Sequence, residues 1–234
     1  MKRAIALSIC LLLFLTALYP IGVGITACFG YRFTLISIPA FAITIALLST
    51  LLTTLSVVYE DPFPMKWTQV LLALLAPLSM INALFYVLEC PQILVVASVL
   101  LSAGCSCYLT VKHGKGALLR TVALILFAVM LLPVGFSGCV GLLFGGIRQD
   151  TVVQTAASPS GKYYAQVIDS NQGALGGDTF VDVYEKSNIN VFLFKIQKNP
   201  HRVYCGEWGE FESMRIYWED DTCLIINSVA YKIN

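Results

Sequence analysis

Five long runs without a charged residue dominate the first two thirds of the chain, and short polar clusters separate them. A helix rises about 1.5 Å per residue, so about 20 apolar residues cross a hydrocarbon core of about 30 Å. The pattern predicts a membrane α-helical bundle of about five transmembrane helices within residues 1–148, with four or six as the alternatives. The predicted spans are residues 4–29, 33–59, 67–88, 92–111 and 121–147.

After Arg148 the long runs give way to short segments that alternate apolar and polar positions. These segments are rich in β-branched and aromatic residues, and turn-forming residues separate them, which is typical of strands with one buried face. Residues 149–234 are therefore predicted to form a small all-β domain of six or seven antiparallel strands, either a sandwich or a curled sheet. The predicted strands are residues 162–168, 179–184, 191–196, 213–218 and 223–227, with the others unassigned.

The charge distribution predicts an orientation as well as a boundary. Eleven of the first 148 residues are charged, against eighteen of the remaining 86. Cytoplasmic loops carry an excess of Lys and Arg, and a cytoplasmic N-terminus leaves six basic residues inside (Lys2, Arg3, Lys66, Lys112, Lys115 and Arg120) and only Arg32 and Arg148 outside. We therefore expect a multi-pass cell-membrane protein with a cytoplasmic N-terminus and an extracytoplasmic C-terminal domain.

The N-terminus has a second interpretation. Lys2-Arg3 followed by an apolar stretch also begins a secretory signal peptide, and Ile25-Thr26-Ala27-Cys28 resembles a lipoprotein cleavage box. A lipoprotein normally continues into a polar tether, whereas here Phe33 soon begins another apolar run. Cleavage stays open as an alternative and would not change the orientation of the rest.

Two ladders of small residues predict helix-packing seams. Ser98, Ser102 and Ser106 recur every four residues, as do Ser137, Gly141 and Gly145. This spacing lines one helix face with small side chains and lets another backbone approach closely. The seams could pack within the bundle or between protomers of a homo-oligomer. Asn82, the strongest polar side chain within a span, is interpreted as an interhelical hydrogen-bonding residue.

Candidate chemistry is sparse, and we predict no catalytic residues, metal ligands or cofactor site. The acidic C-terminal residues match no calcium loop, and the glycine-rich segment 173–178 lacks the ending of a phosphate-binding loop. Residues 149–234 hold seven basic and eleven acidic residues, so nucleic-acid binding has no electrostatic support. Cys205 and Cys223 are the only cysteines there, which leaves a disulfide between them and two free thiols as rival hypotheses.

The order of features in the tail supplies a resemblance. Ser158-Pro159-Ser160-Gly161-Lys162-Tyr163 opens it, and it closes with Trp218, Asp220-Asp221-Thr222 and Leu224-Ile225-Ile226-Asn227. This arrangement resembles the β domain of a family of small Gram-positive bacterial membrane proteins catalogued only as a domain of unknown function. Glu219 departs from the family's ending, because it separates Trp218 from the acidic pair. The resemblance implies a bacterial cell membrane and brings no functional residues.

These observations favour a non-enzymatic protein that displays its β domain outside the cell to bind or sense an envelope component or partner protein. The alternative is an accessory or regulatory subunit of a membrane transporter or channel. The helices lack ionisable residues at mid-membrane depth, which argues against an ion-coupled transporter in its own right. A third hypothesis is an envelope enzyme that uses exposed polar residues such as His201 or Glu212.

Overall fold

The structure is a computed structural model that describes residues 2–59, 62–63, 65–89, 93–144, 149–172 and 176–233. Several predicted features lie outside these residues. They are the boundary residue Arg148, Gly145 of the second seam, the last residues of the fifth predicted span and the first three residues of the glycine-rich segment 173–178. All structural statements below concern the described residues.

Five helices in the described residues are long and apolar enough to cross a membrane, as the sequence predicts. Their lengths of 21 to 28 residues match the span that a hydrocarbon core requires. The fold class is therefore confirmed, and the chain is a multi-pass membrane protein. The helices are α1 (Lys2–Cys28), α2 (Ile38–Val58), α3 (Lys66–Glu89), α4 (Ile93–His113) and α5 (Ala117–Phe144).

The second predicted span is wrong at its start, because residues 31–35 form a strand, β1 (Tyr31–Leu35), instead of a helical turn. The helix begins only after Ser37, whose hydroxyl accepts a hydrogen bond from the Ala40 amide at 3.4 Å. Pro39 in the first turn has no amide to donate, which suits this position. Absence of charge could not reveal this boundary, since the strand is as uncharged as the helix apart from Arg32.

The chain divides into two compact units that do not follow a single cut in the sequence. The helical unit comprises Met1–Ile25, Phe33–Gly141 and Phe192–Phe194. The β unit comprises Thr26–Arg32, Leu142–Val191 and Lys195–Asn234. Three residues from the C-terminal region therefore belong to the helical unit.

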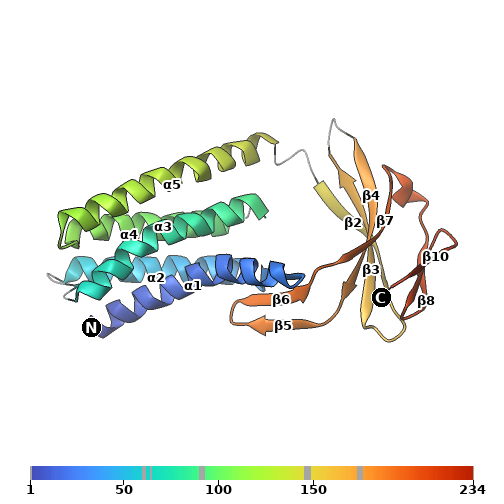
Figure 1. The fold of residues 1–234 in the computed structure, drawn as a ribbon, viewed down its shortest axis with the longest axis horizontal. Helices are drawn as coiled ribbons and strands as arrows, with labels where there is room; N and C mark the ends of the chain where they lie inside the picture. The colour runs from blue at the N-terminus through green and yellow to red at the C-terminus, as the bar shows by residue number, and fades with distance from the viewer. Residues whose placement is uncertain are drawn as a thin grey trace. The chain divides into compact units, whose positions relative to one another are not determined.

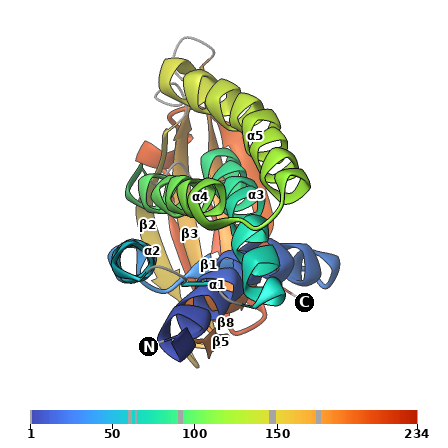
Figure 2. The ribbon, with the colours of Figure 1, turned by 90° about the vertical axis from the view of Figure 1, so that its left-hand side faces the viewer.

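Within the helical unit, α4 packs against both α2 and α3 (Figures 1 and 2). α3 and α4 run antiparallel, because Ser106 pairs with Leu72 while Ser102 pairs with Ser79 further along α3. α5 differs from the other helices. Only 11% of its most apolar stretch is buried, against 33–50% in the others, so most of its surface is free for lipid or another helix.

Phe194 lies at the centre of an aromatic cluster in the helical unit. It is fully buried, and its ring is stacked on Phe33 with 4.8 Å between centroids. The rings of Tyr19 of α1 and Phe41 of α2 also contact it, with centroids 6.1 and 5.6 Å from that of Phe194. Tyr19 in turn stacks on Tyr86 of α3 at 4.1 Å. The cluster thus joins the last third of α1, the start of α2 and the end of α3.

The β unit contains two antiparallel sheets (Figure 1). One has the strand order β2-β3-β4-β7 and the other β10-β9-β8, while a third sheet has the order β1-β6-β5. Nine described strands follow α5, more than predicted, because the polar β2 and the four-residue β5 and β10 show little apolar alternation. They are β2 (Gln149–Ala157), β3 (Tyr163–Asn171), β4 (Gly177–Glu185), β5 (Asn188–Val191), β6 (Phe194–Lys198), β7 (His201–Glu207), β8 (Ile216–Asp220), β9 (Cys223–Ile226) and β10 (Val229–Lys232).

The four-stranded sheet and the β8–β10 sheet share one hydrophobic core, so the β unit is a sandwich. Alternate residues of β3 and β4 line one side of this core, and Met214 with residues of β8 and β9 lines the other. The Trp218 indole N–H donates to the Ala156 carbonyl at 3.0 Å and ties β8 to β2. The core residues are Ala165, Val167, Val181, Val183, Met214, Ile216, Leu224, Ile226 and Ile233.

Candidate functional site

Two turns that lie about 60 residues apart in the sequence meet at one end of the sandwich. The first is Ser158–Tyr163, between β2 and β3, and the second is Asp220–Cys223, between β8 and β9. The Ser160 amide donates to the Asp221 carboxylate at 3.0 Å. The two turn segments are thus in direct contact.

The first turn is built by its own side chains. The Ser158 hydroxyl accepts a hydrogen bond from the Tyr163 amide and the Ser160 hydroxyl one from the Lys162 amide, both at 3.2 Å. Serine forms such local bonds readily in turns. Gly161 has a φ of +70°, a conformation that glycine adopts without steric cost. Lys162 and Tyr163 are therefore held in a defined position at the start of β3.

The second turn follows the same principle with a carboxylate as acceptor. Asp220 accepts from both the amide and the hydroxyl of Thr222, at 2.6 and 2.8 Å. These bonds favour the charged form and lower the pKa of Asp220 below its usual range. The Ile233 amide donates to the Thr222 carbonyl at 2.7 Å, which fastens the C-terminal segment to this turn.

A cavity of about 520 Å³ opens where the two turns and the C-terminal segment meet. Its size lies within the range of small-molecule sites, roughly 300–1,000 Å³. Its lining residues carry two ammonium groups, one carboxylate, an aliphatic hydroxyl, a phenol ring and an aliphatic side chain. The lining residues are Lys162, Tyr163, Asp221, Thr222, Lys232 and Ile233.

The charged groups at this cavity are arranged by their neighbours. The Lys162 ammonium lies 4.8 Å from the centre of the Tyr163 ring. The pKa of Lys162 is raised, first by a side-chain hydrogen bond with Tyr163 and then by electrostatic interaction with Tyr163, Glu185 and Asp221. The pKa of Asp221 is lowered, first by the Ser160 amide and then by the hydroxyls of Ser160 and Ser158. At neutral pH the cavity therefore carries two positive charges and one negative charge.

The aromatic wall of the cavity is supported from the core side. The Tyr163 ring stacks on Trp218 with 6.3 Å between centroids and an angle of 18° between planes. Trp218 is itself fixed by its hydrogen bond to Ala156. Trp218 thus supports the aromatic wall of the cavity.

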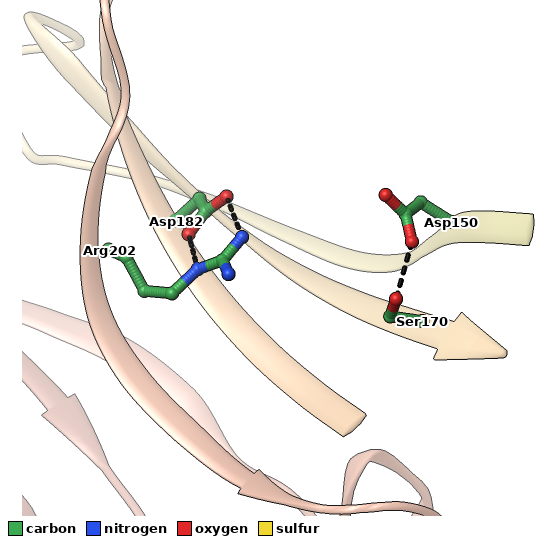
Figure 3. Close-up of polar contacts among 4 residues, drawn as sticks. All are labelled: Asp150, Ser170, Asp182 and Arg202. Carbon is green, nitrogen blue, oxygen red and sulfur yellow. Dashed lines mark hydrogen bonds and ion pairs between the residues drawn. The ribbon is translucent and has the colours of Figure 1, made fainter. Parts of the chain in front are cut away.

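A second group of polar residues lies on the other face of the four-stranded sheet (Figure 3). The Arg202 guanidinium donates to both oxygens of Asp182, at 2.8 and 3.1 Å, and lies 3.6 Å from the centre of the Phe180 ring. Ser170 donates to Asp150 at 2.5 Å. Asp182 is nearly fully buried, and its bidentate pairing raises the pKa of Arg202. Because the guanidinium already donates to both carboxylate oxygens, this ion pair is better suited to holding β4 and β7 together than to binding a ligand.

His201 and Glu212, the two polar residues considered for catalysis, lie on different elements. His201 is on β7, where it pairs with Val183 of β4. Glu212 lies in the exposed 3-10 turn Glu210–Glu212. Within the described residues, no cluster of three or more His, Cys, Asp or Glu side chains could hold a metal ion.

The structure does not contain the disulfide hypothesised between Cys205 and Cys223, both of which are free thiols. Cys205 lies opposite Phe180 in the β4–β7 pair, and directly paired residues project from the same face. The neighbouring Val181 faces the sandwich core, so Cys205 projects away from it. Cys223 is on β9 in the other sheet, across that core.

The first small-residue seam lies at the contact between α3 and α4. Ser98, Ser102 and Ser106 are all buried, and Ser106 donates to the Leu72 carbonyl of α3 at 2.5 Å. Asn82 is also fully buried on α3, but neither of its amide atoms has a hydrogen-bond partner among the described residues. Ser137 and Gly141 of the second seam lie on α5.

The cavity residues were not identified from the sequence. Lys162 and Asp221 belong to segments recognised only as turns, and Lys232 is an isolated basic residue near the end of the chain. Ser158 and Ser160 indicate the first turn, and Asp220 and Asp221 indicate the second. Nothing in the spacing indicates that residues 160, 221 and 233 meet, because that depends on strand pairing.

Comparison with known proteins found no matching family model, curated protein or solved structure. The class of the protein therefore rests on its fold, that of a multi-pass membrane protein. Its described residues contain five helices long and apolar enough to cross a membrane, followed by a C-terminal β region.

Proposed function

We propose that the chain displays its β sandwich on the outer side of the cell membrane, where the cavity between the two turns binds an envelope component. The observation that carries this proposal is the cavity itself. It joins three distant segments of the chain and presents charged and aromatic groups together. The helices then serve to hold the domain at the membrane surface.

The outward orientation is supported by the charge bias and by the aromatic cluster. Six basic residues lie on the side of the N-terminus and two on the other side, which favours a cytoplasmic N-terminus. Phe194 contacts Tyr19, which is 17 residues or about 25 Å along α1 from Lys2. Phe194, which follows α5 in the sequence, thus contacts the half of α1 that is remote from the N-terminus, as expected for an odd number of spans.

Labelling of intact cells tests the orientation. A variant that keeps only Cys205, with the other seven cysteines changed to serine, is treated with a membrane-impermeant maleimide. Cys205 is exposed on β7, so we expect labelling without permeabilisation. The matched control places the single cysteine at Lys115 in the loop between α4 and α5, where labelling should require permeabilisation.

The opposite labelling pattern would overturn the proposal. If Cys205 reacts only after permeabilisation while Lys115→Cys reacts in intact cells, the β domain faces the cytoplasm. Equal labelling of both sites in intact cells would show leaky cells, which an intracellular marker protein detects. The experiment therefore decides orientation independently of any ligand.

The sparse packing of α5 favours a second candidate function, an accessory or regulatory subunit of a membrane transporter or channel. Ser137 is half-buried in this stretch of α5, and its small side chain permits close helix contact. Gly141→Leu should release a transporter or channel polypeptide that co-purifies with the wild-type chain from native membranes. Gly135→Leu lies on a different face of α5 and should leave that complex intact. Purification of the wild-type chain alone would remove this candidate.

A further inference from the structure

We propose that the cavity lined by Lys162 and Lys232 binds a phosphate group, carried either by a small soluble molecule or by a lipid headgroup. This inference rests on the proposed function, because it names the chemistry of the component that the displayed domain would bind. It is argued from the charges, the shape and the supporting contacts of the cavity.

Two lysines from opposite ends of the domain sequence line the same cavity. Like charges repel, so a fold that brings them together gains from an anion placed between them. Within the described part of the chain, the salt bridges involve Lys198 with Glu185 and Arg202 with Asp182, and neither cavity lysine takes part in one. Both side chains are exposed, which leaves their ammonium groups able to reach a ligand.

The carboxylate in the lining does not cancel this preference. Asp221 accepts a hydrogen bond from the Ser160 amide, so one oxygen is already directed into the neighbouring turn. Its role is to hold the two turns together. The lining keeps a net charge of one positive unit, from two lysines and one aspartate.

The shape of the cavity favours a phosphate attached to a small organic group. Its volume of about 520 Å³ is larger than a bare phosphate needs. The Tyr163 ring, supported by Trp218, and the side chain of Ile233 provide apolar walls for such a group. Lysine binds phosphate as a compact point charge and needs no fixed planar geometry.

The other basic site of the sandwich is less suited to an anion. Arg202 is already paired with both oxygens of the buried Asp182 and stacks on Phe180. An incoming phosphate would have to displace a bidentate partner there. The lysine cavity requires no such displacement.

Binding to the full-length protein in neutral maltoside micelles tests the proposal, with inorganic phosphate and glycerol 1-phosphate as probes in isothermal titration calorimetry. We expect saturable binding that weakens as salt is added. Lys162→Gln and Lys232→Gln should each weaken it about tenfold, the loss typical of one charge-assisted hydrogen bond. Arg215→Gln removes the same charge at the other end of β8 and should change the affinity less than about twofold.

A second arm identifies the source of the phosphate. The full chain is placed in nanodiscs of phosphatidylcholine alone or with phosphatidylglycerol. If the phosphate is that of a phosphatidylglycerol headgroup, this lipid should raise the apparent dissociation constant of glycerol 1-phosphate in the wild type. If the physiological ligand is soluble, glycerol 1-phosphate should bind equally in both nanodiscs.

Absence of saturable binding by the wild type would overturn the proposal, and so would an equal loss in Arg215→Gln and Lys232→Gln. Circular dichroism of each variant checks that the fold is retained, and Lys232→Arg should recover most of the affinity. Failure here leaves the maleimide labelling of Cys205 unaffected. The phosphate site and the outward display of the domain can therefore fail separately.

Discussion

Gly22 of α1 shows how one missing side chain determines the packing of the helical unit. A Cβ atom at this position would lie 2.6 Å from the ring of Phe33, too close for any relaxed contact. Phe33 in turn stacks on Phe194. Gly24, two residues further on, has open space where its Cβ would be.

We therefore expect opposite results from two alanine substitutions in the same helix. Gly22→Ala should displace Phe33 and destabilise the protein by about 1–3 kcal/mol, as overpacking does. Gly24→Ala should be neutral or stabilise by up to about 1 kcal/mol, because alanine favours the helix. Thermal unfolding of the purified protein in detergent, followed by tryptophan fluorescence, measures both. Equal melting temperatures for the two variants would contradict the packing seen at Gly22.

Tyr204 of β7 is a second residue whose surroundings lead to a measurable property. Its hydroxyl donates to the Glu210 carboxylate at 2.6 Å, which raises the pKa of Tyr204 from 10.0 to about 12. A raised pKa in the folded state means that the bond stabilises the protein at pH below about 10. That contribution is lost as the pH rises through about 12.

Tyrosine ionisation can be followed by absorbance near the ultraviolet tyrosinate band. Tyr204→Phe should remove a component that titrates near pH 12 and leave the earlier components unchanged. Glu210→Gln should lower the pKa of that component toward 10, because it removes the charge that opposes ionisation. Loss of a component at pH 10 in Tyr204→Phe would show that the hydrogen bond is absent in solution.

At the scale of elements, the hairpin formed by β5 and β6 has an unusual position. Its residues Phe192–Phe194 belong to the helical unit, although they follow α5 by about 50 residues. Phe192 has a φ of +56°, a strained value for a residue with a side chain, and it is largely exposed. Phe194 is fully buried among rings of α1 and α2, and the Leu193 carbonyl accepts a hydrogen bond from the Ile36 amide at 2.9 Å.

The two phenylalanines of this hairpin are therefore expected to differ in their effect on stability. Phe194→Ala leaves a cavity among the surrounding rings and should cost about 3–5 kcal/mol. Phe192→Ala removes a mostly exposed ring with one edge contact to Phe14 and should cost less than about 1 kcal/mol. The two variants are compared by the fraction of protein that remains folded after heating, measured by size-exclusion chromatography in detergent. A similar loss for both variants would mean that Phe194 is not a core residue of the helical unit.

At the scale of the whole molecule, the β unit is held together by packing and hydrogen bonds and contains no disulfide between Cys205 and Cys223. The shared core of the two sheets supplies the apolar burial that such a small domain needs. The partial burial of Cys223 and the nearby Glu219 raise the pKa of its thiol.

Alkylation of the native protein tests this description. Without reductant, unfolding should expose both thiols to iodoacetamide, as mass spectrometry of the tryptic peptides would show. In the folded protein Cys223 should react slowly at pH 8, because a raised pKa leaves little thiolate. Glu219→Gln should increase that rate severalfold. A peptide pair joined through Cys205 and Cys223 would refute the assignment of free thiols.

Much of the fold could be predicted from local patterns. The absence of charge over 20 or more residues indicates a membrane span, because lipid offers no partner to a charge, and all five spans were found this way. The start of α2 was missed because β1 is almost as uncharged as the helix that follows. Short or polar strands such as β5 and β2 were missed because their pairing partners, and not their own alternation, make them strands.

The sequence by itself determined which segments suit lipid and which suit water, since hydropathy and charge are properties of a residue and its near neighbours. It therefore determined five spans, a β region and the turns at Ser158–Tyr163 and Asp220–Thr222. Only the tertiary structure decided that those turns meet, that Lys232 joins Lys162 at one cavity and that Phe194 enters the helical core. Each of these depends on contacts between residues tens of positions apart, which strand register and helix packing create together.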